Sequence, residues 1–469
     1  MNCNVIILAA GKGTRMKSKL DHKSKVSYEI LGVPLVEHVL NAVSEINPSK
    51  IITIVGFGGE VTKEIVTKNP KVQIAWQLEQ KGTGHAVMQA QDLLDPEGVS
   101  VVLCGDAPLI RGETLKAIVD THVANGYDET VLTAVLSNPH GYGRIVRNEQ
   151  GLVSEIVEQS ECDEKQNLIN EVNTGVVAFS NKALLEALPR LTNNNKKGEY
   201  YLTDLIAMFN KEGKKVGAVI LSDPNEMLGI NDRVQLAEAA KIMKQRINKF
   251  HMLNGVTLID PENTYIGPYV QIGADTVIEP NVHIYGKTTI GERNFIGATS
   301  YITDSTFGDD NSIVSSQIEE STLGDGNAVG PFAHLRPKSS LANKCKVGNY
   351  SELKNAQVGN KSKVPHLTYL GDCTVGEGTN IGCGTIVDNY DGVNKTHTDI
   401  GDNVFVGSGA TIISPVNVAS NSFIAAGSTI NRDVNEDDMA ISRPRQENKP
   451  NYAHVLKEKA LAKKAKKNG

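Results

Sequence analysis

The stretch "YIGPYVQIGADTVIEPNVHIYGKTTIGERNFIGATSYI", residues 265–302, decides the fold of the second half of this chain. An isoleucine recurs at every sixth position, from Ile266 to Ile302, and a glycine often follows it. Neither the two-residue period of a strand nor the 3.6-residue period of a helix produces this repeat. A hexapeptide period predicts a parallel β-helix, in which three hexads form one coil and the aliphatic residues fill one continuous core.

The same repeat continues almost to the end of the chain, with a few five-residue steps. Its later members are Phe307, Ile313, Ile318, Leu323, Val329, Leu335, Leu341, Val347, Leu353, Val358, Val364, Leu370, Val375, Ile381, Val387, Ile400, Val406, Ile412, Val418, Ile424 and Ile430. The series breaks between Val387 and Ile400, where the polar insert "DNYDGVNKTHTD" occupies residues 388–399. We expect this insert to leave the coil as a loop, and its neighbours favour a functional role over a merely tolerated insertion.

The first 230 or so residues follow a different pattern. Buried strands are predicted at residues 5–10, 51–57, 100–106, 130–136 and 174–180, and amphipathic helices at 34–46 and 84–94. This alternation predicts a Rossmann-like α/β fold with a mostly parallel sheet, whose ligands lie beyond the carboxyl ends of the strands. A long helical pattern follows, so we expect an α/β domain at 1–233, a helical linker at 234–254 and the β-helix at 255–469.

Composition sets limits on function. The 469 residues carry a net charge of −6, which argues against a general nucleic-acid coat. The six cysteines form no C-x-x-C pair, so neither a zinc site nor a redox motif is indicated. With no apolar stretch long enough to span a membrane, we expect a cytoplasmic protein. The lysines between residues 457 and 467 are interpreted as a solvated end.

A glycine-containing loop follows the first predicted strand. The stretch "LAAGKGTRM", Leu8 to Met16, matches neither the P-loop nor the dinucleotide pattern. Its backbone N–H groups, with Lys12 and Arg15 beside them, suit the phosphates of a nucleotide. Asp106 ends another buried strand, where it is either a Mg²⁺ ligand or an ordinary turn residue.

One histidine stands out in the repeat half. His366 lies in "VPHLTYLGD", residues 364–372, just before the coil that expels the insert. A histidine there can take a proton from an amine, although a surface histidine in a solenoid turn is the simpler interpretation.

Several motifs together resemble one known family over nearly the whole chain. In the first half they are LAAGKGTRM, the Lys25–Val26 pair, QLEQKGTGHA, GDAPL, GYGRI, VNTG, GEYYLTD and GINDR, in this order. In the second half they are GPFAHLRP, VGNYSELK, HLTYLGD, TNIGCGT, NYDGVNK and AISRPRQ. The chain is similar to the bifunctional N-acetylglucosamine-1-phosphate uridyltransferases that are fused to a glucosamine-1-phosphate N-acetyltransferase.

The resemblance implies roles for the first half. The residues that would hold UTP, and later the sugar nucleotide, are Leu8, Ala9, Ala10, Gly11, Lys25, Gln77, Gly82, Thr83, Gly143, Glu158, Asn173 and Asn231. Asp106 and Asn231 would bind Mg²⁺. Lys23 stays an alternative to Lys25, because Ser24 replaces a proline that is frequent in relatives and the preceding stretch is longer.

The resemblance also implies roles for the second half, including a left-handed coil and a homotrimer with acetyltransferase sites between subunits. His366 would be the general base. Arg336, Lys354, Tyr369 and Asn380 would hold glucosamine-1-phosphate, and Cys383, Asn389, Tyr390, Ser408, Ala426 and Arg443 would hold acetyl-CoA. The product would feed peptidoglycan and other envelope polymers, with neither nucleic acid nor a membrane span involved. Two alternatives stay open: a single-activity pyrophosphorylase with a scaffolding β-helix, and a non-catalytic assembly subunit.

Overall fold

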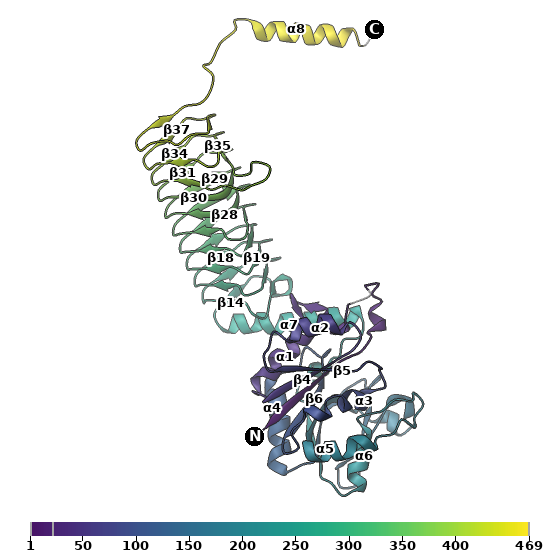
Figure 1. Ribbon diagram of the computed structural model, residues 1–469. Helices are drawn as coiled ribbons and strands as arrows, with labels where there is room; N and C mark the ends of the chain where they lie inside the picture. Colours follow the sequence, from purple (N-terminus) through teal and green to yellow (C-terminus); the bar gives the residue numbers. More distant parts are fainter. Residues whose placement is uncertain (1, 21–22, 468–469) are drawn as a thin grey trace. The chain divides into compact units, whose positions relative to one another are not determined.

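The computed structural model describes residues 2–20 and 23–467, and the chain forms two compact units (Figure 1). The first unit ends at Phe250 and takes in Tyr265–Pro268, and the second comprises His251–Thr264 and the chain from Tyr269 onward. Among the described residues, no helix is both long and apolar enough to cross a bilayer.

The first unit is built on a mixed sheet in the order β11-β7-β10-β6-β1-β4-β5, with the hairpin β8–β9 attached to β10. The strands are β1 (Cys3–Ala9), β4 (Lys50–Val55), β5 (Val72–Trp76), β6 (Val99–Cys104), β7 (Glu129–Val135), β8 (Arg144–Arg147), β9 (Val153–Val157), β10 (Glu171–Ser180) and β11 (Val216–Ile220). The prediction of a mostly parallel sheet is confirmed, because β1 runs parallel to β4 and β6, and β7 to β11. Strand β10 runs antiparallel to both of its neighbours.

Helices cover both faces of this sheet. Their bounds are α1 (Leu35–Glu45), α2 (Gly59–Val66), α3 (Thr83–Met88), α4 (Gly112–Asn125), α5 (Asn181–Ala187) and α6 (Asp204–Lys211), with a small hairpin of β2 (Glu29–Ile30) and β3 (Val33–Pro34) before α1. Alternate residues of β1 supply the two cores: Val5 and Ile7 pack with α1, α2 and α4, while Ile6 packs with α3, α5 and α6. The result is a three-layer sandwich.

The long helix α7 (Arg233–Leu253) confirms the helical pattern that follows the sheet. It does not run free through solvent. Ala239 is fully buried in a third apolar cluster, together with Met16, Tyr28 and Leu109 of the first unit. The first half of this helix therefore belongs to the packed core around the glycine-containing loop.

The second unit is a parallel β-helix, as the hexapeptide period predicts. Each aliphatic residue of the repeat is buried except Ile272, which is half-buried near the start. One face consists of β12 (Thr257–Leu258), β15 (Val277–Ile278), β18 (Phe295–Ile296), β21 (Ser312–Ile313), β24 (Ala328–Val329), β27 (Lys346–Asn349), β29 (Lys363–His366), β31 (Asn380–Ile381), β34 (Phe405–Val406), β37 (Phe423–Ile424) and β39 (Met439–Ala440).

The strands of the other two faces form one continuous sheet around a corner. They are β13 (Tyr265–Ile266), β14 (Gln271–Ile272), β16 (His283–Tyr285), β17 (Thr289–Ile290), β19 (Tyr301–Thr303), β20 (Thr306–Phe307), β22 (Gln317–Glu319), β23 (Thr322–Leu323), β25 (His334–Leu335), β26 (Ser340–Leu341), β28 (Glu352–Val358), β30 (Tyr369–Val375), β32 (Ile386–Asp388), β33 (Thr398–Ile400), β35 (Thr411–Ile413), β36 (Asn417–Val418) and β38 (Thr429–Ile430). After the last coil the chain forms the exposed helix α8 (Tyr452–Ala465).

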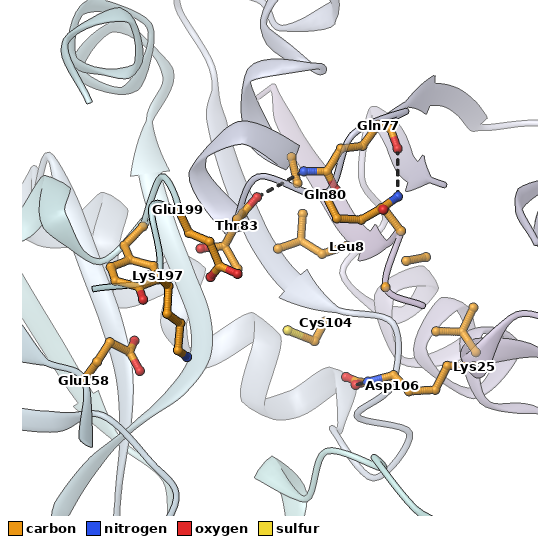
Figure 2. Close-up of a pocket in the computed structure, with 17 residues that line it drawn as sticks. Leu8, Lys25, Gln77, Gln80, Thr83, Cys104, Asp106, Glu158, Lys197 and Glu199 are labelled. Carbon is orange, nitrogen blue, oxygen red and sulfur yellow. Dashed lines mark hydrogen bonds and ion pairs between the residues drawn. The ribbon is translucent and has the colours of Figure 1, made fainter. Parts of the chain in front are cut away.

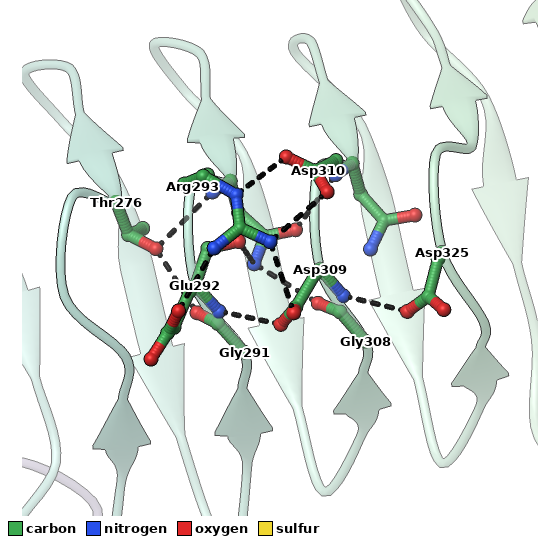
Figure 3. Close-up of polar contacts among 10 residues, drawn as sticks. Thr276, Gly291, Glu292, Arg293, Gly308, Asp309, Asp310 and Asp325 are labelled. Atoms are coloured by element: carbon green, nitrogen blue, oxygen red, sulfur yellow. Dashed lines mark hydrogen bonds and ion pairs between the residues drawn. The ribbon is translucent and has the colours of Figure 1, made fainter.

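The glycine that follows many of the aliphatic residues has a structural cause at the corners. In Figure 3 a side-chain oxygen of one coil accepts a hydrogen bond from the backbone of the coil before it: Asp309 Oδ1 accepts from the N–H of Glu292 at 2.8 Å, and Asp325 Oδ1 from that of Asp309 at 2.9 Å. A Cβ atom at Gly291 would overlap the Asp309 carboxylate. Glycine at this position therefore leaves room for the side chain that caps the coil.

The polar insert leaves the coil as expected. Across it, Cys373 pairs with Thr398, twenty-five residues later, whereas Val277 pairs with Phe295, eighteen residues later. The extra residues form a hairpin-like loop, with an antiparallel bridge between Tyr390 and Lys395, that projects from the side of the β-helix (Figure 1).

Candidate functional site

A cavity of about 420 Å³ opens at the carboxyl ends of β1 and β6 in the first unit (Figure 2). The residues predicted from the sequence that line it are Leu8, Ala9, Ala10, Gly11, Lys25, Gln77, Gly82, Thr83, Asp106 and Glu158. They come from segments up to 150 residues apart, and the sheet gathers them at one edge. This is the position at which an open α/β sheet places its ligand.

The positively charged side chain of Lys25 is held at one end of the cavity by two oxygen atoms. The Lys25 ammonium forms an ion pair with the Asp106 carboxylate and donates a hydrogen bond to Asn231 Oδ1 at 3.2 Å. The Lys25 and Asp106 side chains are only 14% and 16% exposed, so this pair is largely shielded from water. The two oxygen donors thus form a site for positive charge.

The structure also shows which of the two candidate lysines lines the cavity: Lys25 does, and Lys23 does not. Lys25 begins a short 3-10 helix, Lys25–Ser27, and the Ser24 hydroxyl caps it by accepting from the N–H of Val26 at 3.3 Å. The Ser24 hydroxyl also accepts from Thr62 Oγ1 at 2.9 Å. Lys23 instead lies over the Tyr28 ring, with its Nζ 4.3 Å from the ring centre. The geometry therefore favours Lys25 as the lysine of the cavity.

The cations of the glycine-containing loop are not in this cavity. Lys12 lines a smaller neighbouring pocket with Gly13 and Lys23, and the Arg15 side chain is exposed. The backbone of Ala10 and Gly11 faces the cavity, so the phosphate contacts expected of this loop are available from its N–H groups.

The opposite wall of the cavity carries Gln77, Gly82 and Thr83. Gln77 is 4% exposed and donates from Nε2 to the carbonyl oxygen of Gly82 at 3.1 Å. Gly82 has φ of 103°, and a Cβ atom there would lie 2.6 Å from the Tyr200 carbonyl oxygen. Only glycine permits the turn that presents Thr83 at the start of α3.

Glu158, Asn173 and Gly143 meet at the deeper side. The Asn173 N–H donates to the Gly143 carbonyl oxygen at 2.9 Å, and a Cβ atom at Gly143 would lie 3.7 Å from Glu158 Oε1. Burial raises the pKa of the Glu158 carboxyl, and Lys197 opposes that rise. Asn173 itself lines an inner cavity behind the main one.

Other lining residues were not assigned a role from the sequence. They are Val26, Gln80, Ala86, Cys104, Lys197, Glu199 and Tyr201. The signal for six of them was present. Glu199 and Tyr201 lie in the quoted motif GEYYLTD and Lys197 precedes it, Val26 belongs to the quoted Lys25–Val26 pair, and Gln80 and Ala86 lie in QLEQKGTGHA. Burial raises the pKa of the Cys104 thiol to about 12, so this sulfur stays protonated.

In the β-helix, the residues expected to hold glucosamine-1-phosphate form a charged cluster. Arg336 donates to Glu352 at 2.9 Å. Contact with Lys395 lowers the pKa of the Lys354 amino group, and desolvation and the charges of Lys395 and Arg336 lower it further. Burial raises the pKa of Tyr369, whose hydroxyl lies near Glu352. The cluster presents several positive groups on one surface.

Lys395 and Asp372 belong to this cluster and had no predicted role. Lys395 comes from the expelled loop, which therefore returns to the coil surface beside Lys354. Asp372 accepts from Asn355 Nδ2 at 2.7 Å and from Asn389 at the root of the loop. The lysine stands in the quoted motif NYDGVNK, which is the signal that could have found it.

His366 lies at a corner with a defined ring orientation. Its Nδ1 is 2.9 Å from the side-chain oxygen of Asn349, one coil earlier. Because an amide oxygen only accepts, Nδ1 carries the hydrogen and Nε2 keeps its lone pair. His366 is exposed, so this lone pair faces solvent or substrate.

The residues expected to bind coenzyme A continue from His366 along the same corner. The His366 carbonyl accepts from Gly384, that of Cys383 from Gly409, and that of Ser408 from Gly427. Arg443 then donates from Nη1 to the Ala426 carbonyl at 2.6 Å. At ~4.8 Å per coil, four steps give a track of roughly 19 Å. Tyr390 stands on the expelled loop, and Asn380 begins β31.

For a metal, the described residues contain no group of three or more histidine, cysteine or acidic side chains close enough to form a site. The oxygen donors of Asp106 and Asn231 leave the remaining positions of a metal ion to substrate oxygens or water, as Mg²⁺ sites commonly do.

Comparison with known proteins gives matches in both halves. Residues 4–225 match the nucleotidyl transferase family, and residues 269–304 and 397–432 match the bacterial transferase hexapeptide family. The bifunctional protein GlmU of Latilactobacillus sakei is 50% identical over 96% of this chain and 97% of its own length. The proteins of the same description from Enterococcus faecalis and Streptococcus agalactiae are 50% and 48% identical, each over 97% of this chain and 98% of its own length.

Proposed function

The chain belongs to the bifunctional GlmU family, and on this basis we propose how its residues perform the two transfers. The β-helix transfers an acetyl group from acetyl-CoA to glucosamine-1-phosphate. The first unit then transfers uridylyl from UTP to N-acetylglucosamine-1-phosphate and releases pyrophosphate. We assign uridyl transfer to residues 1–233, acetyl transfer to 255–469, and the helix between them to neither.

Uridyl transfer joins two anions, so charge neutralisation is its main requirement. A phosphate oxygen of the sugar phosphate attacks the α-phosphorus of UTP, and the bond to the pyrophosphate oxygen breaks. The nucleophile is already ionised, so no strong base is needed. Lys25 neutralises phosphate charge, the N–H groups of the Leu8–Gly11 segment hold the phosphates, and Gln77 and Thr83 orient the nucleoside.

The residues present fit a Mg²⁺ ion. Asp106 and Asn231 already share a cation, the Lys25 ammonium, and carboxylate and amide oxygens are donors that Mg²⁺ prefers. When bound there, Mg²⁺ would supply Lewis-acid stabilisation of phosphate charge. Glu158, Asn173 and Gly143 would hold the sugar on the deeper side.

Acetyl transfer needs a base and an anchor for the sugar phosphate. Arg336 and Lys354 bind the phosphate, and Tyr369 and Asn380 orient the sugar. The amine nitrogen attacks the thioester carbonyl carbon, His366 Nε2 takes a proton from that nitrogen, and the coenzyme A sulfur leaves and is protonated. Cys383, Asn389, Tyr390, Ser408, Ala426 and Arg443 hold the coenzyme along the corner.

The proposal also covers the oligomeric state and the cellular location of the protein. We propose a homotrimer through the β-helix, because large apolar side chains such as Phe405 and Phe423 are about 40% exposed on its surface. We place the reactions in the cytoplasm, where UTP and acetyl-CoA are available.

The observation that carries the function is the Lys25 ammonium held between Asp106 and Asn231 in a cavity at the carboxyl end of the sheet. The test measures thiol and pyrophosphate release separately. Asp106→Asn is expected to stop pyrophosphate release and keep thiol release, and His366→Ala to do the reverse when N-acetylglucosamine-1-phosphate is supplied. Wild-type protein that releases pyrophosphate but no thiol would reduce the β-helix to a scaffold.

A further inference from the structure

A buried carboxyl group lies behind the nucleotide cavity, outside the machinery described above. Glu129 begins β7 and is 1% exposed. Its Oε2 has no hydrogen-bond partner in the described part of the chain. Burial raises the pKa of this carboxyl well above its usual range and so favours its protonated form, which can both donate and accept a hydrogen bond.

Glu129 lines the inner cavity, which has a volume of about 100 Å³. Leu8, Thr83, Cys104 and Glu158 line both this cavity and the main one, so the two adjoin. Asn173 pairs with Thr133 of β7, and Glu129 lies four residues before Thr133. At ~3.3 Å per residue, the Glu129 backbone therefore lies roughly 13 Å along β7 from the point at which this strand pairs with Asn173.

The lining restricts what can occupy this space. Ile156, Val177 and Leu202 give it apolar walls, and its polar side chains besides Glu129 are Thr83, Glu158, Asn173 and Thr203. Glu158 and Asn173 are proposed to hold the sugar and Lys25 to neutralise the phosphate, so the 2-acylamino group, which carries the apolar part of the substrate, is the group that suits the apolar walls. A buried polar group without a partner is destabilising, so a ligand atom that pairs with Glu129 would be favoured.

We propose that the inner cavity is an acyl subsite, in which Glu129 recognises the terminal hydroxyl of an N-acyl group longer than acetyl. The inference rests on the proposed uridyl transfer and extends its substrates to 2-acylamino sugar 1-phosphates with hydroxyl-ended acyl chains. The chemistry at phosphorus is unchanged, because the subsite contacts only the acyl chain.

The test compares matched acyl groups of equal length on glucosamine-1-phosphate. The pairs are hydroxyacetyl with propionyl, 3-hydroxypropionyl with butyryl, and 4-hydroxybutyryl with pentanoyl. Pyrophosphate release from UTP is measured with the full-length protein, and the kcat/KM ratio within each pair is the readout. We expect wild type to prefer the hydroxyl-ended member about tenfold for at least one pair, the factor expected of one hydrogen bond.

Two variants and a control isolate Glu129. Glu129→Leu should abolish that preference, and Glu129→Gln, which still donates and accepts, should keep it. Glu155→Leu makes the same change on β9, outside both cavities, and should leave the ratio at its wild-type value. A preference that survives in Glu129→Leu, or a wild type without preference at any length, would overturn the acyl subsite.

The two proposals fail differently. If wild type releases no pyrophosphate even with N-acetylglucosamine-1-phosphate, uridyl transfer itself is refuted, and the subsite with it. If that substrate reacts normally while the ratios do not depend on Glu129, only the subsite is refuted.

Discussion

At the scale of single residues, the hydrogen bond between Asn349 and His366 sets the ring orientation of the proposed base. Asn349→Ala removes the acceptor for Nδ1 at 2.9 Å and leaves the ring free to rotate or to change tautomer. We expect kcat for acetyl transfer to fall about 10- to 100-fold, as losing an orienting partner does elsewhere, with KM for glucosamine-1-phosphate nearly unchanged. Steady-state assay of thiol release measures both.

The control keeps the acceptor. Asn349→Asp retains an oxygen in the same place, so it should keep more activity than Asn349→Ala, and uridyl transfer should be unaffected in both. Equal activity of Asn349→Ala and wild type would mean that His366 needs no orienting partner.

A second residue-scale prediction concerns pH. Contact with Lys395 lowers the pKa of the Lys354 amino group, so Lys354 loses its positive charge at lower pH than an ordinary lysine does. Binding of the anionic sugar phosphate should therefore weaken as pH rises through this lowered pKa. Lys395→Gln removes the neighbouring cation, and we expect the rise of KM with pH to move to higher pH.

The same variant loses one cation from the cluster, so its KM at neutral pH should be about tenfold higher than in wild type. The substrate amine titrates equally in both proteins, and the difference between the two pH profiles isolates Lys354. Superimposable profiles of KM against pH would contradict the coupling of these lysines.

At the scale of elements, buried asparagines join the coils of the β-helix. Asn311 Oδ1 accepts from the N–H of Asn327 at 2.9 Å, and Asn327 Oδ1 accepts from that of Cys345 at 2.8 Å. Asn311→Ala leaves the Asn327 N–H buried without its acceptor. We expect a loss of about 2 kcal/mol of stability, seen as a lower melting temperature of the β-helix by circular dichroism.

Asn417→Ala is the matched control, because Asn417 is exposed on β36. The melting temperature of the Asn417→Ala variant should stay close to that of wild type, within the small range typical of surface substitutions. If both variants melt alike, the buried ladder contributes little to stability.

The six-residue period predicted the strands of the β-helix well, because every aliphatic residue of the repeat fills the same kind of core position. Sequence patterns failed for strands whose burial or direction depends on the neighbouring strands. Strand β5, "VQIAW", was not predicted, and in the fold most of its residues are only partly buried or exposed. The antiparallel direction of β10 depends on its neighbours β6 and β7, which no local pattern encodes.

The residues of the candidate site also divide into those that a sequence rule predicts and those that only tertiary packing brings together. The positions of Leu8 and Asp106 follow from the rule that strand ends meet at one edge. Lys395 joins Lys354 only because a loop folds back onto the coil, and Glu129 reaches a cavity through the depth of the sheet. Contacts of that kind depend on tertiary packing, and a single sequence does not display them.

At the scale of the whole molecule, an aromatic strip supports the proposed trimer. Phe405 and Phe423 stack with ring centres 4.8 Å apart, and Met439 continues their row in register. Asn380, a proposed sugar ligand, pairs with Phe405 at the head of the row. Such a strip is typical of an interface, and here it adjoins residues that we propose for acetyl transfer.

Replacing Phe405 and Phe423 together by glutamate should break that interface, because two charges would be buried without partners. Sedimentation should then show the 50.5 kDa single chain in place of a particle about three times heavier. Acetyl transfer should fall at least tenfold, whereas uridyl transfer, whose cavity lies within one chain, should keep its wild-type rate.

Leu168→Glu, the same kind of change on an exposed residue of the first unit, should alter neither activity. A double variant that stays trimeric would place the interface elsewhere, and a wild type that is monomeric and fully active in acetyl transfer would show that one chain holds both complete sites.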